Sequence, residues 1–304
     1  MKKIIIYLSR VNKIGGVETF AFNFCKRMSK HYDITFVYDQ CSSLDYLIKI
    51  SEFVSVHVLD NYQFECETLL LASAWGKNPE KQIKSDKQIQ MVHADYLAYM
   101  EDWHFTYKKY DKTTHHIAVG HHVAKQFQIA TTYKTDAVIH NLLNDDVKFT
   151  PKTKSKQLRL VTISRISIEK GFDRMLKMES LLSGVDFIWD VYGDTSTACA
   201  KSVIPKFNKV NFKGITNKPQ YIMQQYDFVV QLSDTEGFPY SIYEALQVHT
   251  PCIVTDFPSA HELIKNNVNG YILDMNLDNF VVPNKITLNS FHGKSDERDW
   301  FKVL

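Results

Sequence analysis

Residues 228–246 read FVVQLSDTEGFPYSIYEAL, and this stretch decides the fold because it predicts a strand, a tight turn and a helix in that order. Phe228–Leu232 is an apolar run, and Pro239 suits the first turn of a helix, where its missing N–H leaves no hydrogen bond unmade. Glu236 then lies in the loop at the C-terminal end of the strand, and Glu244 lies within the helix. Ligands bind at this edge of open α/β sheets, and helix N-termini attract anions.

Two acids beside an anion site favour a ligand that has hydroxyl groups to hold and a phosphate to anchor, such as a nucleotide sugar. The alternative is that Glu236 satisfies the helix dipole and that Glu244 is an ordinary exposed helical residue. The spacing of the two carboxylates does not decide between these interpretations.

The same alternation of apolar runs and helical stretches continues along the chain and predicts two parallel α/β sheets. A polar, basic stretch at 152–157 interrupts it and is typical of a linker, so we expect domains over 1–150 and 151–289 with a cleft between them. We expect a capped terminal helix within 290–304 that packs back on the first domain. The expected strands are 4–8, 34–38, 54–59, 68–72, 89–92, 116–120, 137–140, 158–164, 186–192, 210–213, 228–232, 251–255 and 270–273.

Composition limits the class of protein. A length of 304 residues fits two domains of roughly 150 residues, and 44% hydrophobic with 23% charged residues is ordinary for a soluble protein. A net charge of +2 argues against a nucleic-acid partner. Five scattered cysteines without a CxxC pair indicate reduced thiols, and no apolar stretch reaches the ~18 residues that cross a bilayer. We therefore expect a cytoplasmic protein.

Glycines follow the first expected strand, at Gly15 and Gly16, and precede a helix over 17–28. Two glycines at a helix start allow a phosphate to approach the backbone closely and leave free N–H groups aimed at it. A plain tight turn explains them equally well, and the spacing is not the G-x-G-x-x-G of dinucleotide-binding proteins.

Basic residues follow the first expected strand of the second domain. Arg165 and Lys170 flank one loop at the C-terminal edge of the sheet and suit a diphosphate, the former as a planar fork and the latter as a point charge. Either could instead pair with Glu169 on a solvated face.

Histidines are the remaining candidates for chemistry. His93 ends a strand of the first domain, where a neutral imidazole could bind a sugar hydroxyl or act as acid or base, although a structural role is the commoner one. We expect the doublets 115–116 and 121–122 to lie on strands, where neighbours point to opposite faces, so each offers one metal ligand at most. No Asp-x-Asp occurs, so we expect neither a metal nor another cofactor.

Aromatic residues interleaved with lysines over 99–112 suit a peripheral contact with a membrane and its anionic head groups. A packed surface helix is the alternative interpretation. Ser241 lacks the G-x-S-x-G surroundings of a hydrolase nucleophile.

Taken together, these segments resemble the retaining glycosyltransferases of family 4 (group 1), which have two facing Rossmann-like domains, the GT-B architecture. The matching pieces occur in the family's order between residues 4 and 273: 15–18, His93, 138–141, 164–171, 191–194, 212–214 and 236–244. The resemblance implies an acceptor-binding domain at 1–150 and a nucleotide-sugar-binding domain at 151–289.

The resemblance also implies the roles of individual residues. The donor diphosphate would be neutralised by Arg165 and Lys170, helped by N–H groups at Gly15 and Gly16. Glu236 would hold the hydroxyls of the transferred sugar, and His93 would contact that sugar at the reacting centre. Glu244 would hold the ribose. Backbone contacts to the sugar and the base would come from Gly237, Phe238, Pro239, Ile215 and Thr216.

The implied activity is the transfer of a hexose from a nucleotide sugar, most simply a UDP-sugar, to a hydroxyl of a glycan or lipid-linked saccharide. It would proceed with retention and without a metal, in surface-polysaccharide or glycoconjugate biosynthesis at the inner face of the membrane. The chain departs from the family pattern at 239–241, at 120–122 and in its short first domain, which puts the acceptor most in question. A non-catalytic accessory subunit and a nucleotide-sugar epimerase of the same architecture are the alternatives.

Overall fold

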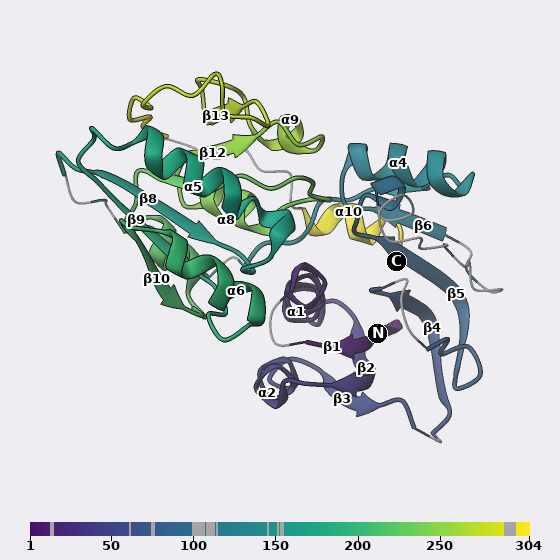
Figure 1. Ribbon diagram of the computed structural model, residues 1–304. Coiled ribbons are helices and arrows are strands. Elements are labelled where there is room, and N and C mark those ends of the chain that lie inside the picture. Colours follow the sequence, from purple (N-terminus) through teal and green to yellow (C-terminus); the bar gives the residue numbers. More distant parts are fainter. Residues whose placement is uncertain are drawn as a thin grey trace. The chain divides into compact units, whose positions relative to one another are not determined.

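The computed structural model describes residues 1–12, 15–60, 62–73, 77–98, 107, 113, 115–144, 146–150, 152, 155–288 and 296–304 (Figure 1). The chain divides into two compact units. The first comprises Met1–Asn144 together with Lys294–Leu304, and the second comprises Asp145–Gly293. Each unit has its own sheet, in which every described strand pair is parallel.

The sheet of the first unit has the doubly wound order β3-β2-β1-β4-β5-β6-β7. Its central strand forms because residues 4 to 8 are all apolar and all buried, which suits a strand covered on both faces. The strands are β1 (Lys3–Val11), β2 (Asp33–Cys41), β3 (Ser55–Val58), β4 (Phe64–Leu71), β5 (Ile83–Val92), β6 (His115–Ala118) and β7 (Ala137–Val138). The helices are α1 (Gly16–Met28), α2 (Leu44–Ser51), α4 (His121–Thr131) and α10 (Glu297–Phe301).

The C-terminal helix α10 completes the core of the first unit. The fully buried Trp300 ring packs edge-on against Phe24, with ring centroids 4.9 Å apart, and at 5.8 Å from Phe20 of the same α1 face. Arg27 pairs with Glu297 at 2.7 Å. Burial alone would raise the pKa of Glu297, but the hydrogen bond and charge of Arg27 outweigh it, and the net shift is downward. The Asp296 side chain caps the helix by accepting from the Arg298 N–H.

The sheet of the second unit has the order β10-β9-β8-β11-β12-β13. The strands are β8 (Leu158–Ile163), β9 (Phe187–Tyr192), β10 (Val210–Gly214), β11 (Phe228–Gln231), β12 (Cys252–Thr255) and β13 (Gly270–Leu273). The helices are η1 (Ile168–Lys170), α5 (Phe172–Leu181), α6 (Ala198–Val203), η2 (Ile204–Lys206), α7 (Pro219–Met223), α8 (Tyr240–Gln247) and α9 (Ala260–Leu263).

Two apolar clusters cover the two faces of this sheet. Leu160 and its alternate neighbours pack with α5 and α6, whereas Val161 packs with α8 and α9. Successive strand residues point to opposite faces, so a continuous apolar run supplies both clusters. In β11, Phe228 and Val230 join one cluster and Val229 joins the other.

The direction of winding reverses between β8 and β11. From β8 the chain proceeds outward to β9 and β10, and it then returns to β11 on the other side of β8. The two strands are neighbours, with Phe228 opposite Leu160 and Val229 opposite Val161. Their C-terminal ends therefore lie side by side at the switch point, where open α/β sheets bind ligands.

Each expected strand corresponds to one of the thirteen strands in the described part of the chain, but some details differ. The units divide at Asn144 instead of residue 150, because Val147 packs in the second core and the Thr150 N–H donates to Gln224 at 2.7 Å. The expectation that residues 121 and 122 lie on a strand is wrong, because His121 and His122 begin helix α4. Pro239 is the N-cap of α8 and not its first helical residue. Of the aromatic and basic stretch 99–112, all but residue 107 lies outside the described residues.

Candidate functional site

The loop after β8 is drawn against the end of β11 by a glycine. Gly171 has a φ of 68°, and a Cβ there would lie 1.7 Å from the Leu232 carbonyl oxygen, so only glycine fits. The Asp234 N–H donates to the Glu169 carbonyl at 2.9 Å, and Arg174 Nε donates to the Leu232 carbonyl at 2.8 Å. These ties place the residues after β8 beside the residues after β11.

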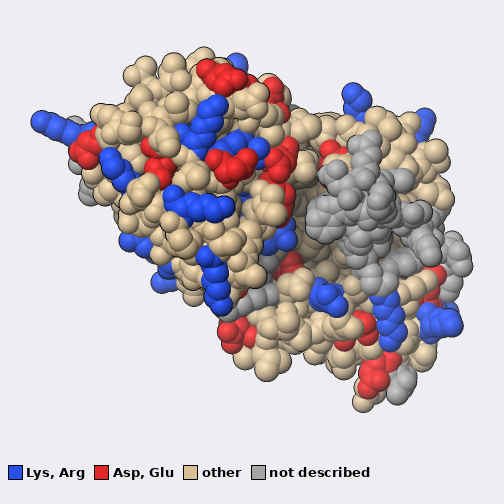
Figure 2. Space-filling view, in the orientation of Figure 1, with Lys and Arg blue, Asp and Glu red and all other residues tan. Residues whose placement is uncertain are grey.

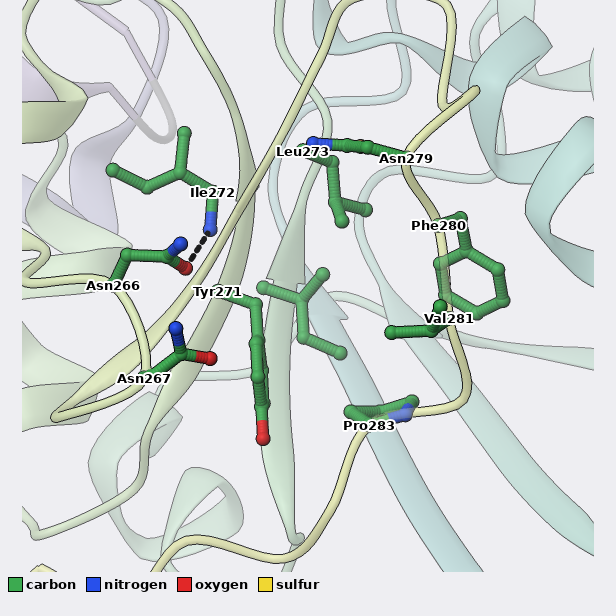
Figure 3. Close-up of a pocket in the computed structure, with 10 residues that line it drawn as sticks. Asn266, Asn267, Tyr271, Ile272, Leu273, Asn279, Phe280, Val281 and Pro283 are labelled. Carbon is green, nitrogen blue, oxygen red and sulfur yellow. Dashed lines mark hydrogen bonds between the residues drawn. The ribbon is translucent and has the colours of Figure 1, made fainter.

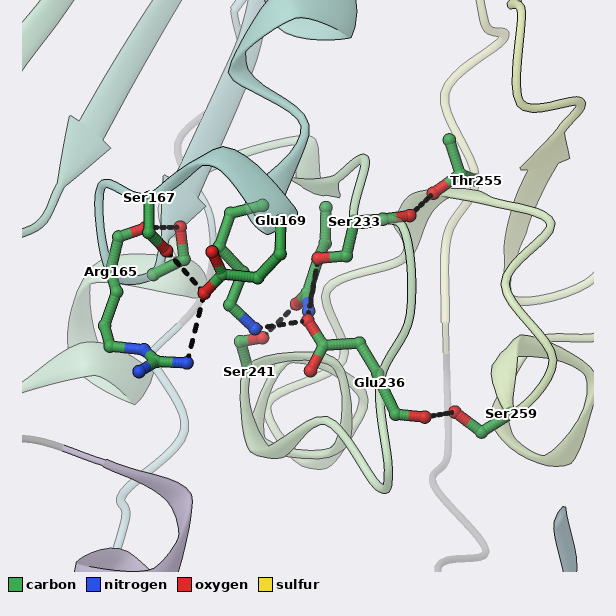
Figure 4. A network of polar contacts seen from close by, with 11 residues as sticks. Arg165, Ser167, Glu169, Ser233, Glu236, Ser241, Thr255 and Ser259 are labelled. Carbon is green, nitrogen blue, oxygen red and sulfur yellow. Dashed lines mark hydrogen bonds and ion pairs between the residues drawn. The ribbon is translucent and has the colours of Figure 1, made fainter. Parts of the chain in front are cut away.

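Lys170 and Glu236 meet at this point. Lys170 Nζ lies 2.7 Å from Glu236 Oε1, and only 13% and 12% of the two side chains is exposed. Ser233 Oγ donates to the same oxygen at 2.7 Å, and Gln231 Nε2 donates to it as well (Figure 4). Ser259 Oγ holds the Glu236 carbonyl at 2.8 Å. The network fixes both the backbone and the carboxylate of Glu236.

Arg165 stands apart from this network. Its guanidinium pairs with Glu169 at 3.2 Å, and 62% of its side chain is exposed. Ser167 Oγ also donates to Glu169 at 2.6 Å, and these bonds outweigh the effect of burial, so the pKa of Glu169 is lowered. The sequence left open whether Arg165 or Lys170 pairs with Glu169. In the structure, Arg165 pairs with Glu169, and Lys170 pairs with Glu236.

Glu244 is buried in α8, with 9% of its surface exposed. Its carboxyl group has no hydrogen bond or ion pair with any residue that the structure describes, and burial raises its pKa from 4.5 to about 8. The group is therefore mainly a neutral acid at pH 7. A carboxyl at so buried a position is costly unless water or a ligand supplies its hydrogen bonds. The view of Glu244 as an exposed helical residue is wrong, because only 9% of it is exposed.

The remaining predicted residues of the second unit lie at the same edge of the sheet. Phe238 is buried and packs edge-on against Tyr243 at 5.0 Å, between Gly237 and the α8 N-cap Pro239. Ile215 and Thr216 follow β10, which lies two strands from β8, and Ile215 is 39% exposed. The Thr216 hydroxyl accepts from the Lys218 N–H at 3.0 Å.

The glycines of the first unit lie at the start of α1. Gly15 is the N-cap of α1 and Gly16 its first residue. A Cβ on Gly15 would lie 2.2 Å from Glu18 Oε2, and the other oxygen of Glu18 accepts from the Asn12 N–H and side-chain amide, both at 3.0 Å. The atom that a Cβ would meet is the end of a flexible side chain and the backbone of Gly15 is extended, so this contact does not by itself require a glycine.

His93 follows β5 in the first unit. Its Nε2 atom is buried and has no hydrogen-bond partner among the described residues, and its ring lies 4.7 Å from the Phe20 ring, edge-on. Burial lowers the pKa of His93 to about 3. The imidazole is therefore neutral at pH 7, as the proposed contact with a sugar hydroxyl needs.

Four polar residues of the network were not among the predicted site residues: Gln231, Ser233, Ser241 and Ser259. Ser241 Oγ donates to Gln231 Oε1. The signal that could have found Gln231 is a long polar side chain at the end of the apolar run FVVQL, since such residues are buried only when they have partners.

A separate cavity of about 150 Å³ lies beside β13 (Figure 3). Its lining mixes apolar side chains such as Phe280 with asparagines, one of which, Asn266, accepts from the Ile272 N–H at 3.1 Å. None of the predicted site residues lines it.

Charges of both signs lie side by side over α5 on the face shown in Figure 2. Lys177 pairs there with Asp278 at 3.2 Å, and Arg174 pairs with Asp234. Within the described ranges, no group of three or more His, Cys, Asp or Glu side chains is placed to hold a metal ion. Nor does any helix in that part of the chain combine the length and apolar character that crossing a membrane requires.

The second unit is similar to a known protein family. Residues 144–282 match the family model described as glycosyl transferases group 1. A search of curated proteins gives no match to the sequence.

The fold as a whole is similar to solved glycosyltransferase structures. Anabaena HepE in complex with UDP and glucose is 16% identical with a TM-score of 0.73, covering 92% of this chain and 88% of its own. A mutant of S. aureus TarM in complex with Fondaparinux, alpha-GlcNAc-glycerol and UDP is 15% identical with a TM-score of 0.70, covering 90% of each chain. The lipopolysaccharide outer core galactosyltransferase WaaB is 15% identical with a TM-score of 0.59, covering 90% and 86%.

Identities this low establish the fold alone, whereas the family match concerns the unit that holds the Lys170–Glu236 network. Residues 144–282 therefore resemble the group 1 glycosyl transferases, and the chain has the GT-B fold of two Rossmann-like domains.

Proposed function

We propose that the protein is a retaining hexosyltransferase that uses a UDP-sugar as donor and needs no metal ion. The observation that carries the proposal is the switch point of the second unit, where a cation and a carboxylate share one buried network. The buried carboxyl of Glu244, on the helix that follows, lacks partners within the described chain. UDP in the HepE and TarM structures supports the choice of nucleotide.

The donor would be held through charge and hydrogen bonds. An ammonium group can donate three hydrogen bonds. Lys170 donates one to Glu236, so two remain for a diphosphate. The exposed fork of Arg165 adds a second cation. We assign Glu244 to the ribose hydroxyls, which would supply its missing partners, and the backbone at Ile215 and Thr216 to the base.

The transferred sugar would be held by Glu236, whose Oε2 has no partner among the described residues, and by the backbone from Gly237 through Pro239. From the first unit we assign Gly15 and Gly16 to the diphosphate and the neutral His93 to the sugar.

The chemistry follows from where charge develops. The leaving diphosphate becomes more negative in the transition state, so prearranged cations stabilise that state more than the ground state. With both assigned carboxyls engaged in binding, the acceptor oxygen would attack the anomeric carbon on the face from which the diphosphate leaves. The bond between sugar and diphosphate would break, the departing phosphate would take the proton of the acceptor hydroxyl, and the configuration would be retained. We place the acceptor among glycans and lipid-linked saccharides of surface-polysaccharide or glycoconjugate biosynthesis, at the cytoplasmic face of the membrane.

The proposal is tested with the purified protein and a panel of UDP-sugars, by measuring UDP release with and without EDTA. Turnover should persist in EDTA and be lost in Glu236→Ala and Arg165→Ala. Lys177→Ala, which removes an exposed lysine of α5 paired with Asp278, is the matched control and should retain turnover. Product NMR should show an unchanged anomeric configuration.

Two outcomes would favour other functions. Absence of UDP binding up to millimolar concentration, measured by calorimetry, would favour a non-catalytic subunit. Conversion of the donor sugar into an epimer without any acceptor would identify an epimerase. Normal turnover in both site variants would refute the assignment of the residues.

A further inference from the structure

The hydrogen bonds to the Glu236 carboxylate fall on one of its two oxygens. Oε1 receives Lys170 Nζ at 2.7 Å, Ser233 Oγ at 2.7 Å and Gln231 Nε2, whereas Oε2 has no hydrogen-bond partner in the described part of the chain. Figure 4 shows the dashed lines converging on that one oxygen. A carboxylate has capacity for about four hydrogen bonds, so Oε2 remains able to accept.

Gln231 is the neutral member of this set whose orientation is fixed from both ends. It is 4% exposed, at the last position of β11. Ser241, in the first turn of α8, donates to Gln231 Oε1, so the amide nitrogen must face Glu236. The opposite orientation would set the amide oxygen against a carboxylate oxygen, and both are acceptors. The hydrogen bonds therefore run in one direction, from Ser241 to Gln231 to Glu236.

We propose that Gln231, oriented by Ser241, is a positioning residue that presents Glu236 Oε2 to the hydroxyls of the transferred sugar. The inference rests on the proposed function, because it requires Glu236 to hold that sugar. Gln231 hydrogen-bonds to Glu236, and its replacement would leave the Lys170–Glu236 ion pair in place. We therefore expect the replacement to affect binding of the sugar and not of the nucleotide.

The ion pair explains why a third donor matters. A lysine ammonium is a point charge on a flexible stem and fixes the distance of a carboxylate better than its rotation. A planar amide held at both ends restrains that rotation. Preorganisation of this kind lowers the cost of binding and raises turnover because the partner group no longer has to be ordered.

The test compares UDP with UDP-sugar in Gln231→Met, Ser241→Ala and the double variant. The donor is whichever of UDP-glucose, UDP-galactose and UDP-N-acetylglucosamine the wild type turns over fastest. We expect Gln231→Met to bind UDP within about twofold of wild type and to lose roughly 10- to 100-fold in kcat/KM, the usual effect of one hydrogen bond to a charged group. Ser241→Ala should lose less, and Ser241→Thr should restore the rate.

The double variant should be no slower than Gln231→Met, because the two residues act through one chain of hydrogen bonds. Ser259→Ala is the matched control, since it removes a 2.8 Å bond to the Glu236 carbonyl and not to the carboxylate. It should affect UDP and UDP-sugar alike.

Wild-type kcat/KM in Ser241→Ala and Gln231→Met, or an equal loss of affinity for UDP and UDP-sugar, would overturn the inference. If Gln231→Met does not fold, Ser241→Ala and Ser241→Thr decide by themselves. Failure of the wild type to bind UDP or to turn over any donor would instead refute the proposed function, and the inference with it.

Discussion

Replacement of Glu244 by glutamine should remove a large pH dependence from the stability of the protein. The carboxyl group is buried without a partner among the described residues, and burial raises its pKa from 4.5 to about 8. In the unfolded chain the group is solvated and returns to its ordinary pKa. Glutamine has nearly the same shape and does not ionise, so the variant resembles the neutral acid at every pH.

The sign follows from proton binding. The folded protein holds the Glu244 proton more tightly than the unfolded chain, so between pH 4.5 and about 8 the folded state carries the extra proton. The free energy of unfolding therefore falls as pH rises through this window and levels off above it. At ~1.4 kcal/mol per pKa unit, the wild type should lose roughly 4 kcal/mol relative to Glu244→Gln between pH 5 and pH 9.

Urea unfolding of both proteins from pH 5 to pH 9 measures this difference, and taking the difference cancels the other titrating groups. Fluorescence of the fully buried Trp189 reports on the second unit. Asp173→Asn, which alters a carboxylate with 77% of its side chain exposed, should follow the wild-type curve. A constant difference between wild type and Glu244→Gln across this range would refute the buried, unpaired carboxyl.

Three further predictions concern the folded framework. Trp300→Ala should cost about 3–5 kcal/mol of stability by urea unfolding, and Phe301→Ala should cost less because that ring is 42% exposed. Gly171→Ala should cost roughly 3 kcal/mol or more, since φ is 68° and the Leu232 carbonyl blocks a Cβ, whereas Gly184→Ala meets no atom within 4 Å and should be near neutral by the same assay. Glu297→Gln should destabilise the protein at neutral pH but not in acid, because the folded-state pKa of Glu297 is lowered; stability curves that stay parallel down to low pH would contradict this.

The sequence predicts the elements of this fold well because most of its strands contain a short apolar run. β11 is legible as FVVQ and β1 as a run of isoleucines, since parallel strands are covered on both faces. Boundaries were less accurate. Residues 146–150 look like the end of the first domain, but Thr150 bonds to Gln224, a contact that no local pattern reveals.

The site was predictable only in part, for a similar reason. Lys170 and Glu236 are 66 residues apart, and strand ends brought together at a switch point explain why both were found as candidates. Their direct ion pair depends on the close approach at Gly171, which spacing does not show. Which of Arg165 and Lys170 pairs with Glu169 likewise depends on side-chain geometry, which the sequence leaves open. The sequence does not identify Gln231 and Ser241 as site residues, because their role depends on the hydrogen bonds that they make with each other and with Glu236.

Because residues 294–304 belong to the first unit, part of that unit is synthesised only after the second unit. The ribosome makes residues 145–293 before it makes Trp300, so the first unit acquires this part of its core only after the second unit has been made. Until then, the α1 surface formed by Phe20 and Phe24 lacks the ring that packs on it. A nascent chain halted anywhere before Trp300 would therefore leave part of the Phe20 and Phe24 surface exposed to solvent, and exposed apolar surface favours aggregation.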